Sequence, residues 1–187
     1  KDTTAEDYIY LIQFERFLER DDLVDIDLKA ALERFPDDVS LLSFYGYLLL
    51  EKGDDKAAIA IFKGGIKRAT TDDKRSELWG NIGDAHHNTG DDKRAFKAYK
   101  KALDYNPNNI LVLNNYAYYM SLEGMELERA LEMSYIAMSA EPNNASYVDS
   151  YAWIIHLLCR NDEAKRYMRQ ALTLSSQRDA SLLCHYA

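Results

Sequence analysis

The sequence predicts an all-α fold, a solenoid in which one unit of two antiparallel helices is repeated along the chain. Helix breakers are scarce, because the 187 residues include only 8 Gly and 3 Pro. That is too few for a β-sandwich or barrel, which needs a turn every eight to twelve residues or so. The breakers also recur in phase: Pro107 and Pro142 are 35 residues apart, and Gly53, Gly90 and Gly124 follow at intervals of 37 and 34. A constant spacing of this kind indicates one supersecondary unit used several times.

This spacing divides the chain into five units and a partial sixth, which we expect to form one domain over residues 1–187. The units are residues 5–38, 39–75, 76–109, 110–144 and 145–178, and the partial sixth is 179–187. The second unit has 37 residues where the third has 34, and we place the extra residues around 70–74.

The third unit shows how each helix pair is expected to form. Its first helix has a packing face with the spacing i, i+3, i+4 and i+7, made of Trp79, Ile82, Gly83 and His86. Gly90 then ends this helix, and Asp91 caps the next one. The second helix has a similar period in Ala95, Tyr99 and Ala102. Pro107 ends it, because proline cannot continue a helix.

The repeated unit resembles the tetratricopeptide repeat of bacterial proteins, and the third unit is close to that family's consensus. The first unit fits at Tyr8, Leu11, Leu28, Ala31 and Pro36, but not at Ile12, Glu19 and Val24. The second fits at Leu42, Tyr45, Gly46, Gly53, Ala58 and Phe62, with Gly65 where alanine is usual. The fourth fits at Leu113, Tyr116, Ala117, Gly124, Ala130 and Pro142. The fifth fits at Val148, Tyr151, Ala152, Ala164, Met168 and Ala171, with Cys159 where glycine is usual.

The resemblance implies a right-handed solenoid whose first helices line a concave groove, the usual peptide site of this family. Counted from the start of each unit, positions 2, 5, 9, 12 and 13 lie nearly opposite the packing positions 4, 7, 8 and 11. We call the surface that they form the groove face. The candidate partner-binding residues on or beside it are Tyr47, Asn81, Asp84, His87, Asn114, Tyr118, Asp149, Trp153 and His156.

The charge of the groove face indicates the kind of partner. In the second to fifth units these positions hold no Lys or Arg, and in the first unit only Arg16 is a cation. This argues against the clamp for acidic peptide tails that some tetratricopeptide domains use. We therefore expect a neutral or basic peptide or helix, with apolar anchors on Tyr47, Tyr118 and Trp153. The alternative is that these aromatic residues pack against neighbouring first helices.

A second function stays open, which is self-association. Residues 181–186 form an apolar stretch without the polar outer face of a terminal repeat, so a homodimer through this C-terminal edge is the alternative to groove binding.

Other classes of function find no support in the sequence. The formal net charge of −8 argues against general nucleic-acid binding, and no apolar run approaches the roughly 20 residues of a membrane span. We find no metal, phosphate-loop or catalytic motif, and we expect a non-catalytic protein without a cofactor. The compartment stays open between the cytoplasm and the bacterial cell envelope, because a signal upstream of Lys1 would decide it.

Overall fold

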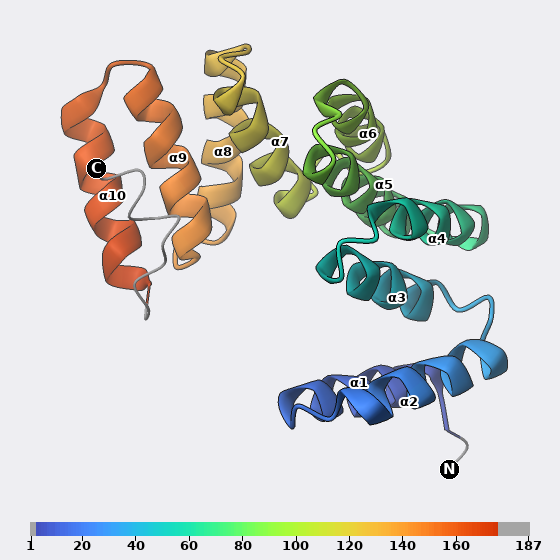
Figure 1. Ribbon diagram of the computed structural model, residues 1–187. Helices are drawn as coiled ribbons and strands as arrows, with labels where there is room; N and C mark the ends of the chain where they lie inside the picture. The colour runs from blue at the N-terminus through green and yellow to red at the C-terminus, as the bar shows by residue number, and fades with distance from the viewer. Residues whose placement is uncertain (1–2, 176–187) are drawn as a thin grey trace. The chain divides into compact units, whose positions relative to one another are not determined.

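Ten α-helices make up most of residues 3–175, which are the residues that the computed structural model describes (Figure 1). In chain order they are α1 (Ala5–Phe17), α2 (Asp21–Arg34), α3 (Val39–Glu51), α4 (Asp55–Arg68), α5 (Asp72–Asn88), α6 (Asp92–Tyr105), α7 (Ile110–Leu122), α8 (Leu127–Ala140), α9 (Ala145–Leu157) and α10 (Asn161–Leu174). Residues 3–175 contain no strand, so the all-α prediction is confirmed. The predicted partial sixth unit, 179–187, lies outside the described residues.

The chain divides into two compact units, Lys1–Pro107 and Asn108–Ala187. In the first unit α1 packs with α2, α3 with α4, and α5 with α6; in the second, α7 packs with α8 and α9 with α10. Each predicted repeat therefore supplies one helix pair, and no pair is divided between the two units. The single domain over residues 1–187 stays a prediction.

The boundary predicted between residues 75 and 76 falls inside a helix. α5 has 17 residues and begins at Asp72, whereas the first helices α1, α3, α7 and α9 have 13 each. The connection before α5, residues 69–71, is correspondingly one residue shorter than the connections 35–38, 106–109 and 141–144. The extra residues of the second repeat thus form one more turn at the start of α5.

The turns inside the repeats explain the regular glycines. Gly53, Gly90 and Gly124 have φ of 76°, 73° and 64°, the left-handed region that glycine enters without a steric penalty. The equivalent residues of the first and fifth repeats are Glu19 and Cys159, which adopt φ of 56° and 61°. The turn geometry is therefore kept in all five repeats, although two of them lack the glycine.

Close helix packing explains two further glycines. A Cβ atom added to Gly46 of α3 would overlap the ring of Phe62 on α4, and one added to Gly83 of α5 would overlap the ring of Tyr99 on α6. Both rings are fully buried. In these two repeats the aromatic ring of the second helix thus lies directly on the backbone of the first.

The apolar residues gather into cores that join successive helix pairs. The first contains Ile12, Val24, Leu28, Leu41 and Leu48, and the second contains Ala58, Phe62, Leu78 and Ile82. A third, in the second unit, contains Met138, Val148, Tyr151, Ile155 and Ala164. Ile12 and Val24 depart from the family consensus, but both are buried, so the degenerate first repeat still packs as a repeat.

Candidate protein-interaction site

In the first unit the groove face follows the first helices α1, α3 and α5. Tyr47 on α3 is 51% exposed, the most open of the predicted aromatic anchors. Asn81, Asp84 and His87 lie on α5 and are partly buried. Phe17, at position 13 of the first repeat, is 81% exposed, so this part of the face offers two accessible rings beside a polar surface.

Polar contacts connect the first helices along this face. Arg16 of α1 forms an ion pair with Glu51 of α3 at 2.6 Å, and the Ser43 hydroxyl of α3 donates to Glu77 of α5 at 2.7 Å. The prediction that the groove face has no cation besides Arg16 needs one correction. The extra turn of α5 brings the Lys74 ammonium to 2.8 Å from Glu77. Arg16 and Lys74 both pair with a carboxylate, so the face still presents no cluster of unpaired cations.

Three of the predicted site residues also hold their own repeat together. The Tyr99 hydroxyl of α6 donates to Asp84 of α5 at 2.5 Å. His87 contacts Asp92 at 2.7 Å, and His156 contacts Asn161 at 2.8 Å, through Nδ1 in both cases. Each of these histidines comes near the end of a first helix and reaches the first residue of the second helix. They therefore fix the turn inside the repeat.

In the second unit the groove face lies on the neighbouring helices α7 and α9. Asn114 and Asp149 are only 6% exposed, so they are poorly placed for first contact with a partner. Tyr118 and Trp153 are partly exposed at the same position of successive repeats. The Tyr118 ring lies 5.7 Å from the ring of Tyr119, and the Trp153 ring lies 5.8 Å from the ring of His156. Each ring therefore lies beside another ring of its own helix.

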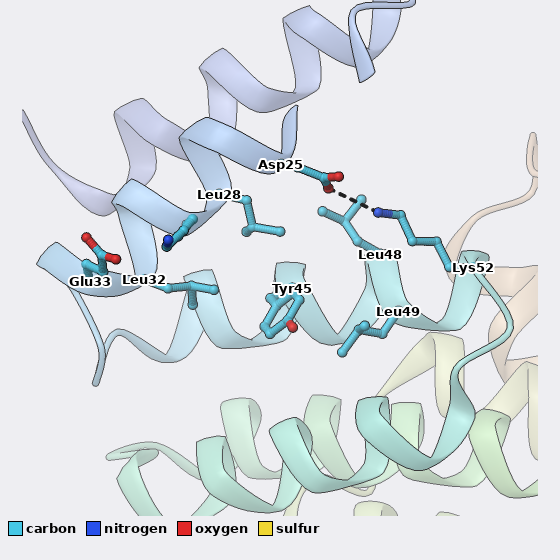
Figure 2. A pocket seen from close by; sticks show the side chains of 9 residues that line it. Asp25, Leu28, Leu32, Glu33, Tyr45, Leu48, Leu49 and Lys52 are labelled. Carbon is cyan, nitrogen blue, oxygen red and sulfur yellow. Dashed lines mark hydrogen bonds and ion pairs between the residues drawn. The ribbon is translucent and has the colours of Figure 1, made fainter. Parts of the chain in front are cut away.

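A cleft between α2 and α3 is a feature that the sequence reasoning missed (Figure 2). It has a volume of about 480 Å³, and its apolar lining comes from Leu28, Leu32, Tyr45, Leu48 and Leu49. Charged side chains border it, and the Lys52 ammonium pairs with Asp25 across the two helices at 3.2 Å. The cleft exists because α2 and α3 meet much less extensively than α4 and α5, or α8 and α9. The poor fit of the first unit to the family consensus was the only signal for it in the sequence.

Two titratable groups occupy position 11, the last packing position, of their first helices. Glu15 of α1 is 5% exposed, and its removal from water, together with the neighbouring Asp27 carboxyl, raises its pKa to about 7. His86 of α5 stands at the equivalent position, and burial lowers the pKa of its imidazole. Both shifts follow from packing inside a repeat.

The described part of the chain lacks two features of other functions. Among residues 3–175, no three His, Cys, Asp or Glu side chains lie together in a way that would hold a metal ion. None of the ten described helices has the length and apolar character of a membrane span.

Comparisons with solved structures agree with this architecture. The chain is similar to pilF of Pseudomonas aeruginosa, with a TM-score of 0.77, 18% identity and coverage of 98% of this chain and 82% of that chain. It is similar to a thermophilic tetratricopeptide protein of Thermus thermophilus (TM-score 0.71, 20% identity, coverage of 98% and 97%). A third similar structure is YrrB, described as a tetratricopeptide protein with an unusual peptide-binding site (TM-score 0.60, 17% identity, coverage of 98% and 91%). At these identities the similarity shows the fold alone.

The sequence comparison gives the family. No curated protein sequence matches the chain. A tetratricopeptide repeat profile matches residues 8–126, which include the first three helix pairs from Tyr8 onward and α7. Since this match covers more than half of the 187 residues and the helix pairs agree with it, the chain belongs to the tetratricopeptide repeat family.

Proposed function

We propose that the protein is a non-catalytic scaffold that binds a segment of a partner protein on its groove face. The observation that carries this proposal is the recurrence of a partly or largely exposed aromatic ring at one position of three first helices, namely Tyr47, Tyr118 and Trp153. Large rings that lose little side-chain entropy on binding are the common anchors of protein interfaces. YrrB, which has the same fold, is described as having a peptide-binding site, and this supports the assignment.

The partner is a neutral or basic peptide or helix with apolar anchor residues. The cations on or beside the groove face, Arg16 and Lys74, are already within ion-pair distance of carboxylates. An acidic ligand would have to break these pairs, whereas a basic one would meet Asp84 and Glu77 as further acceptors.

Selection of binders from a random peptide library tests this proposal. Peptides are selected on the full chain alone, and their affinities for the wild type and for the double variant Tyr118→Ala/Trp153→Ala are then compared. Tyr135→Ala serves as the control, because Tyr135 is 52% exposed but lies on the second helix α8. We expect the double variant to bind the selected peptides at least about tenfold more weakly, and Tyr135→Ala to bind them as the wild type does.

Two results would count against the groove. If Trp153→Ala unfolds the second unit, as followed by circular dichroism, Trp153 is a packing residue. If the selected peptides are acidic and bind the double variant unchanged, the groove face is not their site.

Self-association through the C-terminal edge is the second candidate, motivated by the apolar residues Leu182, Leu183 and Tyr186, which lie outside the described residues. Sedimentation velocity over a wide concentration range separates it from the scaffold proposal. A dimer that is lost in Leu182→Ser/Leu183→Ser favours self-association, and a monomer throughout excludes it.

A further inference from the structure

The outer face of α1 carries a row of exposed large apolar side chains. Tyr10, Leu11, Phe14, Phe17 and Leu18 are between 42% and 81% exposed, and their spacing places them on one side of the helix. Ile12, which is completely buried, lies on the opposite side. A helix that is apolar on both sides is normally covered on both sides. We call these five residues the α1 outer face.

The same face of later first helices is an interface between repeats. Tyr45 and Leu48 of α3 stand at the positions of Leu11 and Phe14, and both pack into the core that α3 shares with α1 and α2. The equivalent residues of α5, Ile82 and Ala85, are at most 1% exposed, and Ile82 packs with residues of α4. First helices of this chain thus use this face to receive the helices that precede them, and the α1 outer face has the composition of such an interface.

The first repeat also carries most of the net charge of the protein. Residues 5–38 contain four Lys and Arg against eleven Asp and Glu, a formal net charge of −7, whereas the whole chain carries −8. On α1 the only cation is Arg16, which pairs with Glu51, and the next one, Arg20, pairs with Asp22 at 3.1 Å. A ligand that approaches the α1 outer face therefore meets an apolar row in a strongly negative field.

A second copy of the chain does not offer a matching surface among its described residues. The most cationic helices, α4 and α6, carry four and five Lys and Arg residues. Their large apolar residues are buried or partly buried in their own repeats, for example Phe62 of α4 and Tyr99 of α6, and Tyr105 at the end of α6 is the exposed exception. Such a helix would bring charge to the α1 outer face but no continuous exposed apolar side.

We propose that the α1 outer face docks a cationic amphipathic helix of another protein, which packs on α1 as a preceding repeat would. The apolar side of the partner helix covers Leu11, Phe14 and Leu18, and its Lys and Arg residues face the acidic side chains of the first repeat. This surface contains none of the groove anchors Tyr47, Tyr118 and Trp153, although Phe17 also stands at position 13 of the groove face. It does not depend on the function proposed above.

Two synthetic helices with the same row of leucines test this proposal, one with lysine and one with glutamate at every polar position. Their binding to the full chain is measured by fluorescence anisotropy at low and high salt. We expect the lysine helix to bind saturably with 1:1 stoichiometry and more weakly as salt increases, and the glutamate helix not to bind. Leu11→Ser/Phe14→Ser should weaken the lysine helix at least about tenfold.

Controls separate this docking from other forms of binding. Ile26→Ser removes an equally exposed apolar side chain from α2, outside the α1 outer face, and should bind the lysine helix as the wild type does. All the substituted side chains are exposed, so the melting temperatures should stay unchanged, and circular dichroism checks this.

Several results would overturn the inference. These are failure of the lysine helix to bind, equal binding of the glutamate helix, and full affinity in Leu11→Ser/Phe14→Ser. If binding is lost only in Tyr118→Ala/Trp153→Ala, the helix occupies the groove face, which overturns this inference and supports the proposed function. A wild-type dimer that disappears in Leu11→Ser/Phe14→Ser would make a second copy the occupant.

Discussion

At two positions a glycine, whose side chain is a single hydrogen atom, lets the two helices of a repeat approach closely. At Gly46 and Gly83 the ring of the second helix occupies the space where any other residue would place its Cβ. Gly64 is different, since a Cβ there would have Arg68 as its nearest neighbour, at 3.7 Å from Nη1. Gly46 and Gly83 stand at position 8 of their repeats, where the fourth and fifth repeats have Ala117 and Ala152, so the recurrence of a small residue marks this contact in the sequence.

This contrast predicts opposite effects of the same substitution. Gly83→Ala should lower the free energy of unfolding by about 1–3 kcal/mol, because the buried Tyr99 ring must move. Gly64→Ala should raise it by about 0.5–1 kcal/mol, because alanine is the better helix former and has room. Urea denaturation of both variants provides the measurement, and a stabilising Gly83→Ala would contradict the packing described above.

Glu15 makes the stability of the first repeat dependent on pH. In the folded chain its pKa is about 7, against an ordinary value of 4.5, because the side chain is buried next to the Asp27 carboxyl. Between these two values the folded state binds more protons than the unfolded state, so the free energy of unfolding decreases as pH rises from 4.5 to 7.

The variant Glu15→Gln should remove this dependence. We expect its stability relative to the wild type to be greater at pH 8 than at pH 5 by about 2 kcal/mol. Denaturation of both proteins at the two pH values gives the difference. Glu33→Gln, at an exposed position of α2, is the control for the loss of one carboxylate from the first repeat.

At the scale of the helix, the sequence predicted the helix pairs well. It did not predict the start of α5 or the cleft between α2 and α3, and both failures have physical reasons. Caps and helix breakers act locally, so the ends of most helices were visible in the sequence. The start of α5 was missed because Asp72 and Asp73 are equally compatible with a turn and with a first helical turn. The cleft between α2 and α3 was missed because it depends on how tightly two helices pack, which hydrophobic periodicity does not report.

The turn after α9 offers a test at this scale. Cys159 has a φ of 61°, which strains any residue with a Cβ. Cys159→Gly should therefore raise the free energy of unfolding by about 0.5–1 kcal/mol. The gain is smaller than the strain that is relieved, because glycine also makes the unfolded chain more flexible. Cys159→Ser keeps the Cβ and should give no gain; equal stability of all three proteins in urea would show that the turn is unstrained.

The cleft predicts that two leucine-to-alanine substitutions lower the free energy of unfolding by unequal amounts. Leu78 is fully buried where α5 meets α4, so Leu78→Ala should leave a closed cavity and cost about 3–4 kcal/mol. Leu48 lines the cleft, so Leu48→Ala only widens an existing space and should cost about half as much. Thermal denaturation of the two variants compares them, and equal losses would mean that α2 and α3 pack closely in solution.

Over the whole molecule, charge is distributed unevenly along the repeats. The first repeat carries −7 of the total of −8, while residues 145–174 hold four Lys and Arg against three Asp and Glu. Like charges close together oppose the compact state, and salt screens them, with a Debye length of about 10 Å at 0.1 M and about 3 Å at 1 M.

The candidate site could be predicted only in outline from patterns in the sequence. Register placed Tyr118 and Trp153 at one position, but burial of Asn114 and Asp149 depends on neighbouring helices.

Hydrogen exchange can detect this uneven charge. Raising sodium chloride from about 0.1 M to 1 M should slow amide exchange in α1 and α2 several-fold more than in α9 and α10, because only the first helix pair has strong self-repulsion to screen. The same slowing in both pairs would indicate a general salt effect.

The additional turn of α5 shows which changes of length such a helix can accept. Four residues rotate a helix by about 400°, so the side chains beyond the insertion return to within about 40° of their former direction. One inserted residue would rotate them by about 100° and turn Leu78 and Ile82 away from α4. Helices of this chain are therefore free to lengthen or shorten by whole turns, as 13 and 17 residues illustrate, and insertions or deletions of other sizes should be confined to the connections.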